Sequence, residues 1–233
     1  MQPHRISGAW LGASPAERSR FEPGVFVDPW FTPLAAAVLS FVTRNSEPAL
    51  SNHSIRSFLF ARLVANERGL VVGRDYPLEA LFCACTLHDI GLTEAGNRGQ
   101  RFEVDGADLA SELLASHGVA TAQIDIVWQA IVLNSSPGIA ERFGVVCDLT
   151  LAGVVVDFTG APFISDTTAS RIHEAYPRLK IGSALSDAIV TQARDKPQKA
   201  PLFSMSAQVV EQRSTAPHIT ELERIARTGR WGE

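Results

Sequence analysis

Most of this chain repeats apolar and polar residues with the three-to-four-residue spacing of α-helices. In residues 51–68, Ile55, Phe58 and Leu63 fall on one stripe, which predicts an amphipathic helix. Residues 145–158 are apolar almost throughout; the valines at 154–156 also suit a strand, but the length of the run favours a helix. The same spacing predicts further helices at residues 34–44, 77–89, 105–117, 121–133, 167–176, 182–194, 204–212 and 220–227.

Capping residues mark the ends of several of these helices. Thr32 and Pro33 suit the cap and the first turn of the helix at 34–44. Gly69 suits the end of the helix at 51–68, and Gly91 is expected to close the helix that starts at Pro77, in a left-handed conformation. Since no strand-like pair joined by a hairpin turn stands out, the pattern predicts an all-α fold with helix-on-helix packing.

The first 30 residues differ from the rest of the chain. They are rich in proline, glycine, serine and charge, with Trp10, Phe21, Phe26 and Trp30 scattered among them. We expect residues 1–30 to form an extended N-terminal arm, with one short helix near residues 15–20, that packs on the body or on a second subunit. Residues 31–233 are expected to form one domain, and a homo-oligomer is a possibility.

Composition and charge narrow the class of protein. A chain of 233 residues with 45% apolar residues can bury a sizeable core. Its net charge of −4 argues against a nucleic-acid-binding surface. The odd number of cysteines, three, does not suggest a disulfide framework, and no apolar run approaches the roughly 20 residues of a membrane span. With no secretory signal apparent either, we expect a cytoplasmic protein that binds neither nucleic acid nor membrane.

Four polar residues in apolar surroundings are candidates for a metal-binding site. His88 and Asp89 are neighbours after an apolar run, His53 lies beside the stripe of the helix at 51–68, and Asp157 is a lone acid among valines and Phe158. Imidazole and carboxylate both bind divalent metals, and a buried carboxylate is costly unless it is paired or bound to a metal. Each residue also has an ordinary structural explanation, such as a core histidine or an aspartate paired with an arginine.

The order His53, His88-Asp89, Asp157 on three predicted helices resembles the HD-domain superfamily of metal-dependent hydrolases. These proteins are all-α and hold a divalent metal with these four side chains. Several blocks between about residues 50 and 160 also resemble the cyanamide hydratase-like branch of the superfamily. These blocks are S-N-H-S-I-R at 51–56, L-H-D-I-G at 87–91, R-F-E-V-D-G-A at 101–107, and the segment from Trp128 to Glu141.

The resemblance implies a multi-helix HD-domain bundle with the metal-site core at about 50–160 and additional C-terminal helices at 161–233. It implies metal ligation by His53, His88, Asp89 and Asp157, with zinc first and iron, manganese, nickel or cobalt as alternatives. We expect one metal ion, because the only histidine between the His-Asp pair and Asp157 is His117, at a predicted helix end. The branch usually has a histidine where this chain has Asn134, which cannot shuttle a proton near pH 7.

The resemblance also implies an enzyme that acts on a small molecule. In the favoured interpretation, metal-bound water attacks the carbon of a cyanamide- or nitrile-like compound. An HD-type phosphohydrolase acting on a small phosphate ester or nucleotide is the alternative, and a non-catalytic ligand-binding protein is a third. The candidate catalytic residues are Thr93, Arg101, Glu103 and Asn134, with Glu103 as the general base; Glu103 and the nearby Asp105 would also suit the start of a helix.

Overall fold

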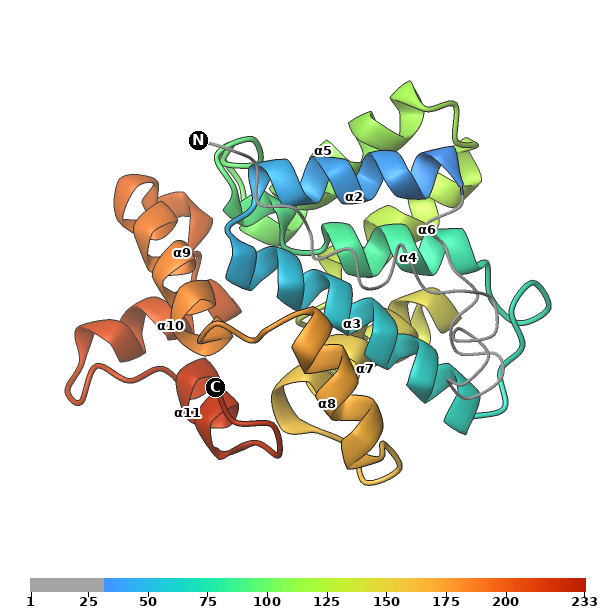
Figure 1. Cartoon of the computed structure of the whole chain (residues 1–233). Coiled ribbons are helices and arrows are strands. Elements are labelled where there is room, and N and C mark those ends of the chain that lie inside the picture. The colour runs from blue at the N-terminus through green and yellow to red at the C-terminus, as the bar shows by residue number, and fades with distance from the viewer. Residues whose placement is uncertain (1–31) are drawn as a thin grey trace.

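In the computed structural model, the described part of the chain, residues 32–233, is built from helices (Figure 1). The predicted arm at residues 1–30 lies outside the described residues. Within residues 32–233, an isolated bridge between Val72 and Tyr76 is the only strand-like pairing, so the all-α prediction is confirmed. The helices are α2 (Pro33–Asn45), α3 (Pro48–Glu67), α4 (Leu78–Leu87), α5 (Phe102–Ser116), α6 (Thr121–Val132), α7 (Val145–Thr159), α8 (Asp166–Ala175), α9 (Ile181–Asp195), α10 (Met205–Ser214) and α11 (Glu221–Thr228), with short 3₁₀ turns η2 (Ile90–Leu92), η3 (Ala140–Arg142) and η4 (Pro197–Lys199).

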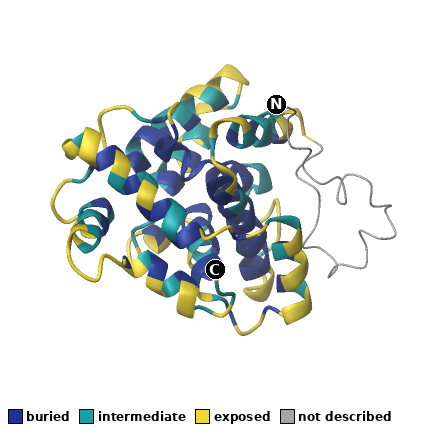
Figure 2. Cartoon of the chain, turned by 60° about the vertical axis from the view of Figure 1, so that its left-hand side comes forward, coloured by how far each residue is buried: buried dark blue, intermediate teal, exposed yellow. Residues whose placement is uncertain are grey.

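Helix α3 runs through the middle of the bundle and packs against α2, α4, α7, α8 and α9 (Figure 1). Its residues from Ala49 to Ala65 are buried almost without exception, including polar side chains such as Ser54 and Arg56. Figure 2 shows that the buried segments gather in the middle of the fold and the exposed ones at its edge. The expectation of an amphipathic helix was therefore wrong: neighbouring helices cover the polar face as well. Helix α7 approaches α3 closely at Gly153, because a Cβ there would overlap the carbonyl oxygen of Ser57.

The residues before and after the His-Asp pair also depart from expectation. Helix α4 ends at Leu87, one residue before His88, and Asp89 has left the helical conformation at φ −102° and ψ 6°. Gly91 does not close the helix in a left-handed conformation but lies within η2. Glycine is needed there because the backbone of α5 crosses closely, and a Cβ on Gly91 would overlap the carbonyl oxygen of Phe102. The run at 145–158 forms helix α7, so the strand alternative was wrong.

The C-terminal helices form a second layer beside the main bundle. Helices α9, α10 and α11 contact one another, and α9 also packs against α3 (Figure 1). A separate apolar cluster joins the two layers, with Leu50 and Phe102 on one side and Leu185 and Ile189 on the other. Among the described residues, no helix combines the length and apolarity needed to cross a membrane.

Candidate metal centre

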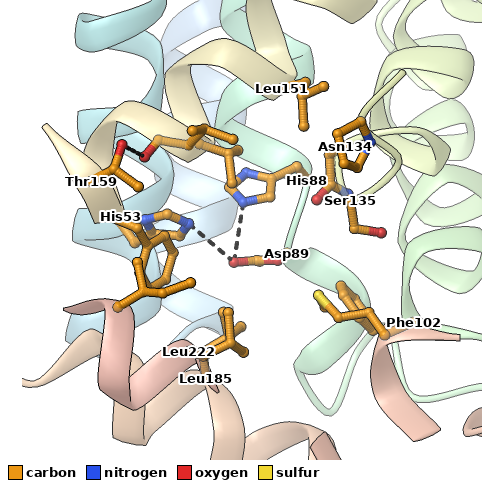
Figure 3. A pocket seen from close by; sticks show the side chains of 16 residues that line it. His53, His88, Asp89, Phe102, Asn134, Ser135, Leu151, Thr159, Leu185 and Leu222 are labelled. Carbon is orange, nitrogen blue, oxygen red and sulfur yellow. Dashed lines mark hydrogen bonds and ion pairs between the residues drawn. The ribbon is translucent and has the colours of Figure 1, made fainter. Parts of the chain in front are cut away.

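Three side chains from two separate stretches of the chain converge on one buried point (Figure 3). His53 comes from the second turn of α3, and His88 and Asp89 come from the end of α4. Asp89 Oδ2 lies 3.2 Å from His88 Nε2 and 3.8 Å from His53 Nε2. Because Asp89 is no longer helical, its carboxylate turns back toward its neighbour, and one ligand atom from each residue lies within 4.8 Å of the others.

Hydrogen bonds at Nδ1 of both imidazoles leave Nε2 as the nitrogen that faces this point. His53 Nδ1 lies 2.6 Å from Oδ2 of Asp157, and His88 Nδ1 lies 2.7 Å from the carbonyl oxygen of Cys85. Since both partners only accept hydrogen bonds, each Nδ1 carries the hydrogen. In the neutral form of each ring, Nε2 therefore carries the lone pair and faces Asp89, which is the arrangement that a bound metal requires.

Asp157 lies behind His53 and is held by two arginines. Arg56 donates from Nε to Oδ1 and from Nη2 to Oδ2, each at 2.7 Å. Arg178 donates from Nη1 to Oδ1 at 3.2 Å and to the main-chain oxygen of Asp157 at 2.6 Å. The carboxylate of Asp157 thus faces the outer nitrogen of His53, and it is not among the atoms that converge with His88 and Asp89.

The pKa values around the centre follow from burial and from these contacts. Burial alone would raise the pKa of Asp157, but Arg56 and His53 hold it well below its ordinary value. Burial lowers the pKa of His53 despite its contact with Asp157. Burial also acts to lower the pKa of His88, yet the carboxylate of Asp89 outweighs it and raises that pKa. The buried Asp89 therefore favours a positive charge beside it.

The donor set fits a divalent cation. His53 Nε2 and Asp89 Oδ2 are fully buried and have no hydrogen-bond partner among the described residues. Leaving such atoms unpaired costs free energy, on the order of 1–3 kcal/mol each. Two imidazole nitrogens and one carboxylate oxygen match the three-ligand sets of catalytic zinc sites, which keep a further position open. HD domains bind divalent metals, and these three side chains are the group that suits one.

A cavity of about 250 Å³ opens onto the three candidate ligands. Asn134 and Ser135 line one side of it, and Thr159 lies on the side of His53 (Figure 3). Asn134 Nδ2 donates to the carbonyl oxygen of Ile131 at 2.5 Å. Most of the remaining lining is apolar and includes Leu151, Val154, Val155, Leu185, Leu222 and Ile225.

Of the other predicted catalytic residues, the structure places Glu103 one contact away from the cavity. Glu103 is fully buried, and its Oε1 accepts a hydrogen bond from Ser135 Oγ at 3.0 Å. Arg101 pairs with the same carboxylate from the outer side. Thr93 lies elsewhere, where its hydroxyl donates to the carbonyl oxygen of Ile90 at 2.7 Å and closes a turn.

Two further residues named from the sequence have structural contacts outside the cavity. Asp105 accepts from the backbone amides of Arg98 and Gln100 at 3.1 Å and pairs with the buried Lys199, which orders the loop before α5. His117 is exposed at the end of α5, where its Nδ1 bonds the carbonyl oxygen of Leu113 at 2.9 Å.

Sequence reasoning missed three residues that shape the centre: Arg56, Ser135 and Arg178. Arg56 belongs to the same S-N-H-S-I-R block as His53 and lies one helical turn after it, so the spacing held the signal. Ser135 follows Asn134 directly and could have been included with it. Arg178 lies between α8 and α9 in no periodic pattern, and nothing in its sequence context pointed to Asp157.

Comparison with known proteins agrees with the geometry. The HD domain family model matches residues 50–161, which include His53, His88, Asp89 and Asp157. Two cyanamide hydratases of Saccharomyces cerevisiae, DDI2 and DDI3, are each 27% identical to this chain over 183 residues, covering 75% of this chain and 79% of each relative. The matches support a metal-dependent hydrolase or hydratase. The matched segment supports membership of the HD-domain superfamily, and the chain is similar to cyanamide hydratases.

Proposed function

We propose that this protein is a metal-dependent hydratase that adds water across the carbon–nitrogen triple bond of a small cyanamide- or nitrile-like compound. The observation that carries the proposal is the pair of buried, unpartnered atoms, His53 Nε2 and Asp89 Oδ2, beside His88 Nε2 at one end of a cavity. The choice of substrate is supported by the similarity to proteins named cyanamide hydratase.

His53, His88 and Asp89 would hold the metal. A divalent ion, with zinc the first choice for this donor set, supplies the charge that lowers the pKa of a water molecule and polarises the substrate. Asp157 holds the imidazole of His53 in the tautomer that offers Nε2, through the contact of 2.6 Å to Nδ1. We therefore assign Asp157 a positioning role and not direct ligation.

The cavity wall favours a neutral substrate over a phosphate ester. None of the described residues that line the cavity is a lysine or an arginine. Enzymes that transfer or hydrolyse phosphoryl groups place cationic side chains or metal ions on the phosphoryl oxygens. Arg56 and Arg178 are close by but already share the carboxylate of Asp157. The phosphohydrolase alternative thus has little support from this site.

Hydration forms one bond between the oxygen of water and the nitrile carbon, and the nitrile nitrogen gains a proton as the triple bond opens. Ser135 and Glu103 are placed to handle protons at the cavity wall. Ser135 Oγ donates to Glu103 Oε1 at 3.0 Å, so Glu103 can take up a proton through this hydroxyl. Asn134 Nδ2 donates one hydrogen to the carbonyl oxygen of Ile131, and this bond orients the amide. Oδ1 of Asn134 can accept a hydrogen bond from the substrate.

Metal analysis of the purified chain, followed by assays on cyanamide, simple nitriles and nucleoside monophosphates, tests this function. We expect about one equivalent of divalent metal and formation of urea or amide. The His88→Ala variant, purified in parallel, reports any contaminating activity. Absence of metal would contradict the proposal, and so would phosphate release without turnover of any cyano compound.

A further inference from the structure

We propose that the substrate carries an apolar group beside its cyano group, as in an alkyl or aryl nitrile or an N-alkylated cyanamide, and that helices α9, α10 and α11 bind this group. This inference rests on the proposed function, because it refines the substrate of the same site. It is carried by the size and the chemistry of the cavity beside the candidate metal ligands.

The cavity is larger than a bare cyano compound needs. Its volume of about 250 Å³ approaches the roughly 300 Å³ at the lower end of small-molecule pockets. One water molecule in the liquid takes about 30 Å³, and cyanamide itself is only a few such units in size. A cyano group at His53, His88 and Asp89 therefore leaves most of the cavity for the remainder of the substrate.

The walls of that remaining space are apolar. Phe158 and Val154 come from α7, and Leu185, Leu222 and Ile225 come from the C-terminal helices. A ligand with polar groups there would lose its hydrogen bonds to water without gaining new ones. A hydrocarbon group would instead gain from leaving water and from close packing. The wall chemistry thus selects an apolar substituent.

The polar and apolar parts of the cavity are separated in space. Figure 3 shows Asp89 between the two histidines and the side chains of Leu185 and Leu222, with Asn134 and Ser135 to one side. A substrate with its cyano group at the histidines can direct its other end toward α9 and α11. Binding at both ends would orient the reacting carbon, which is how remote contacts contribute to rate.

Part of the apolar wall comes from outside the matched family segment. The HD domain match ends at residue 161, whereas Leu185, Met205, Leu222 and Ile225 lie beyond it. The segment that matches the family supplies the metal-binding atoms, and the helices after it supply the wall opposite them. Specificity for the apolar group therefore depends in part on α9, α10 and α11, together with the apolar face of α7.

Two measurements on the full chain test this inference separately from the proposed reaction. The first is calorimetric binding of the product-like series from acetamide to hexanamide, which needs no turnover. We expect the Kd to fall roughly fourfold for each added methylene until the cavity is full. The second is the kcat/KM of the metal-loaded protein for cyanamide and for nitriles of increasing chain length. We expect kcat/KM to rise by a similar factor for each added methylene.

The outcomes distinguish the two claims. Turnover of cyanamide together with a flat amide series and flat nitrile rates would overturn the apolar-group inference and leave the hydratase standing. A rising amide series without hydration of any cyano compound would support an apolar ligand and overturn the proposed reaction.

Two variants with matched controls locate the binding site. Val155→Phe adds a ring to the cavity wall at a residue that is 44% exposed, so the fold can accommodate it. We expect the preference for long over short nitriles to fall roughly tenfold. Val71→Phe, at a site 48% exposed and away from the cavity, is the control and should leave the preference unchanged.

Leu222→Ala should weaken hexanamide binding about tenfold and acetamide binding little, whereas Leu113→Ala, a partly buried leucine of α5 outside the cavity, should alter neither. Equal effects of Leu222→Ala and Leu113→Ala would overturn the assignment of the apolar group to this wall.

Discussion

Nδ1 of His53 lies 2.6 Å from Oδ2 of Asp157, on the side of the imidazole that faces away from His88 and Asp89. Asp157 thereby fixes Nε2 as the nitrogen of His53 that faces Asp89, while Arg56 and Arg178 balance the charge of Asp157. A carboxylate, a histidine and a metal in this order are common in metalloenzymes, where the outer carboxylate sets the tautomer and the orientation of the ring. The chain thus uses two arginines to keep one carboxylate ionised behind the centre.

Asp157→Asn should separate positioning from ligation. We expect the affinity for the metal to fall roughly 10–100-fold, the usual cost of losing an outer partner of a ligand. The free energy of unfolding should fall by about 3–5 kcal/mol, because Arg56 and Arg178 lose their buried counter-charge. Asp148→Asn, which breaks only the partly exposed pair with Arg68 at the other end of α7, is the control and should change stability by no more than about 1 kcal/mol.

His88→Ala should abolish stoichiometric metal binding, with a loss of affinity greater than the roughly 100-fold limit for an outer partner. The fold should survive, because the side chain of His88 bonds only the carbonyl oxygen of Cys85 apart from its contact with Asp89. Metal content after dialysis and the far-ultraviolet circular dichroism spectrum measure the two effects, with the exposed His117→Ala as control. Full metal content in His88→Ala would refute its assignment as a ligand, and equal metal loss in Asp157→Asn would make Asp157 a ligand too.

The sequence was informative where the signal is local. His88 and Asp89 are neighbours, and their convergence with His53 was expected from the resemblance to HD domains. Asp157 was recognised as a buried acid, but its partners could not be predicted, because Arg178 reaches it from a connection that has no periodic pattern. Burial alone was compatible with either a metal or an arginine partner. The resemblance implied metal ligation, and the structure shows the contacts of Asp157 with Arg56 and Arg178.

Contacts between distant segments explain the remaining differences. The spacing in α3 showed an apolar stripe, yet it could not reveal that α7 and α8 also cover the face that carries Arg56. Gly91 looked like a helix end, whereas the close approach of Phe102 is what requires a glycine there. The cavity could not be predicted either, since Leu185 and Leu222 reach it only after the C-terminal helices pack on the bundle.

Asn134→His should raise the turnover of cyanamide by about tenfold or more, since an imidazole at the cavity wall can exchange protons near pH 7 and an amide cannot. Steady-state rates with cyanamide at fixed metal content measure the change. Asn45→His is a matched control, because the amide of Asn45 also donates to a carbonyl oxygen of its own helix, that of Phe41, but at an exposed site. Unchanged turnover in Asn134→His would mean that position 134 takes no part in the reaction.

His173 should make the folded protein sensitive to mild acid. Burial, together with the nearby positive charge of Arg56 and Arg178 and despite the opposing effect of Asp157, lowers the pKa of His173 from 6.5 to about 4. Between these values the unfolded chain binds a proton that the folded chain does not, so stability decreases as the pH falls from 6.5 toward 4.

His173→Phe should reduce this loss. The ring of His173 lies near those of Phe60 and Trp231, where a phenyl group suits the surroundings, and its Nε2 is buried with no hydrogen-bond partner. Urea unfolding at pH 7 and at pH 5 measures the effect. We expect a smaller difference between the two pH values for His173→Phe than for the original chain. The exposed His117→Gln should match the original chain, and an unchanged pH dependence in His173→Phe would show that His173 is not the responsible group.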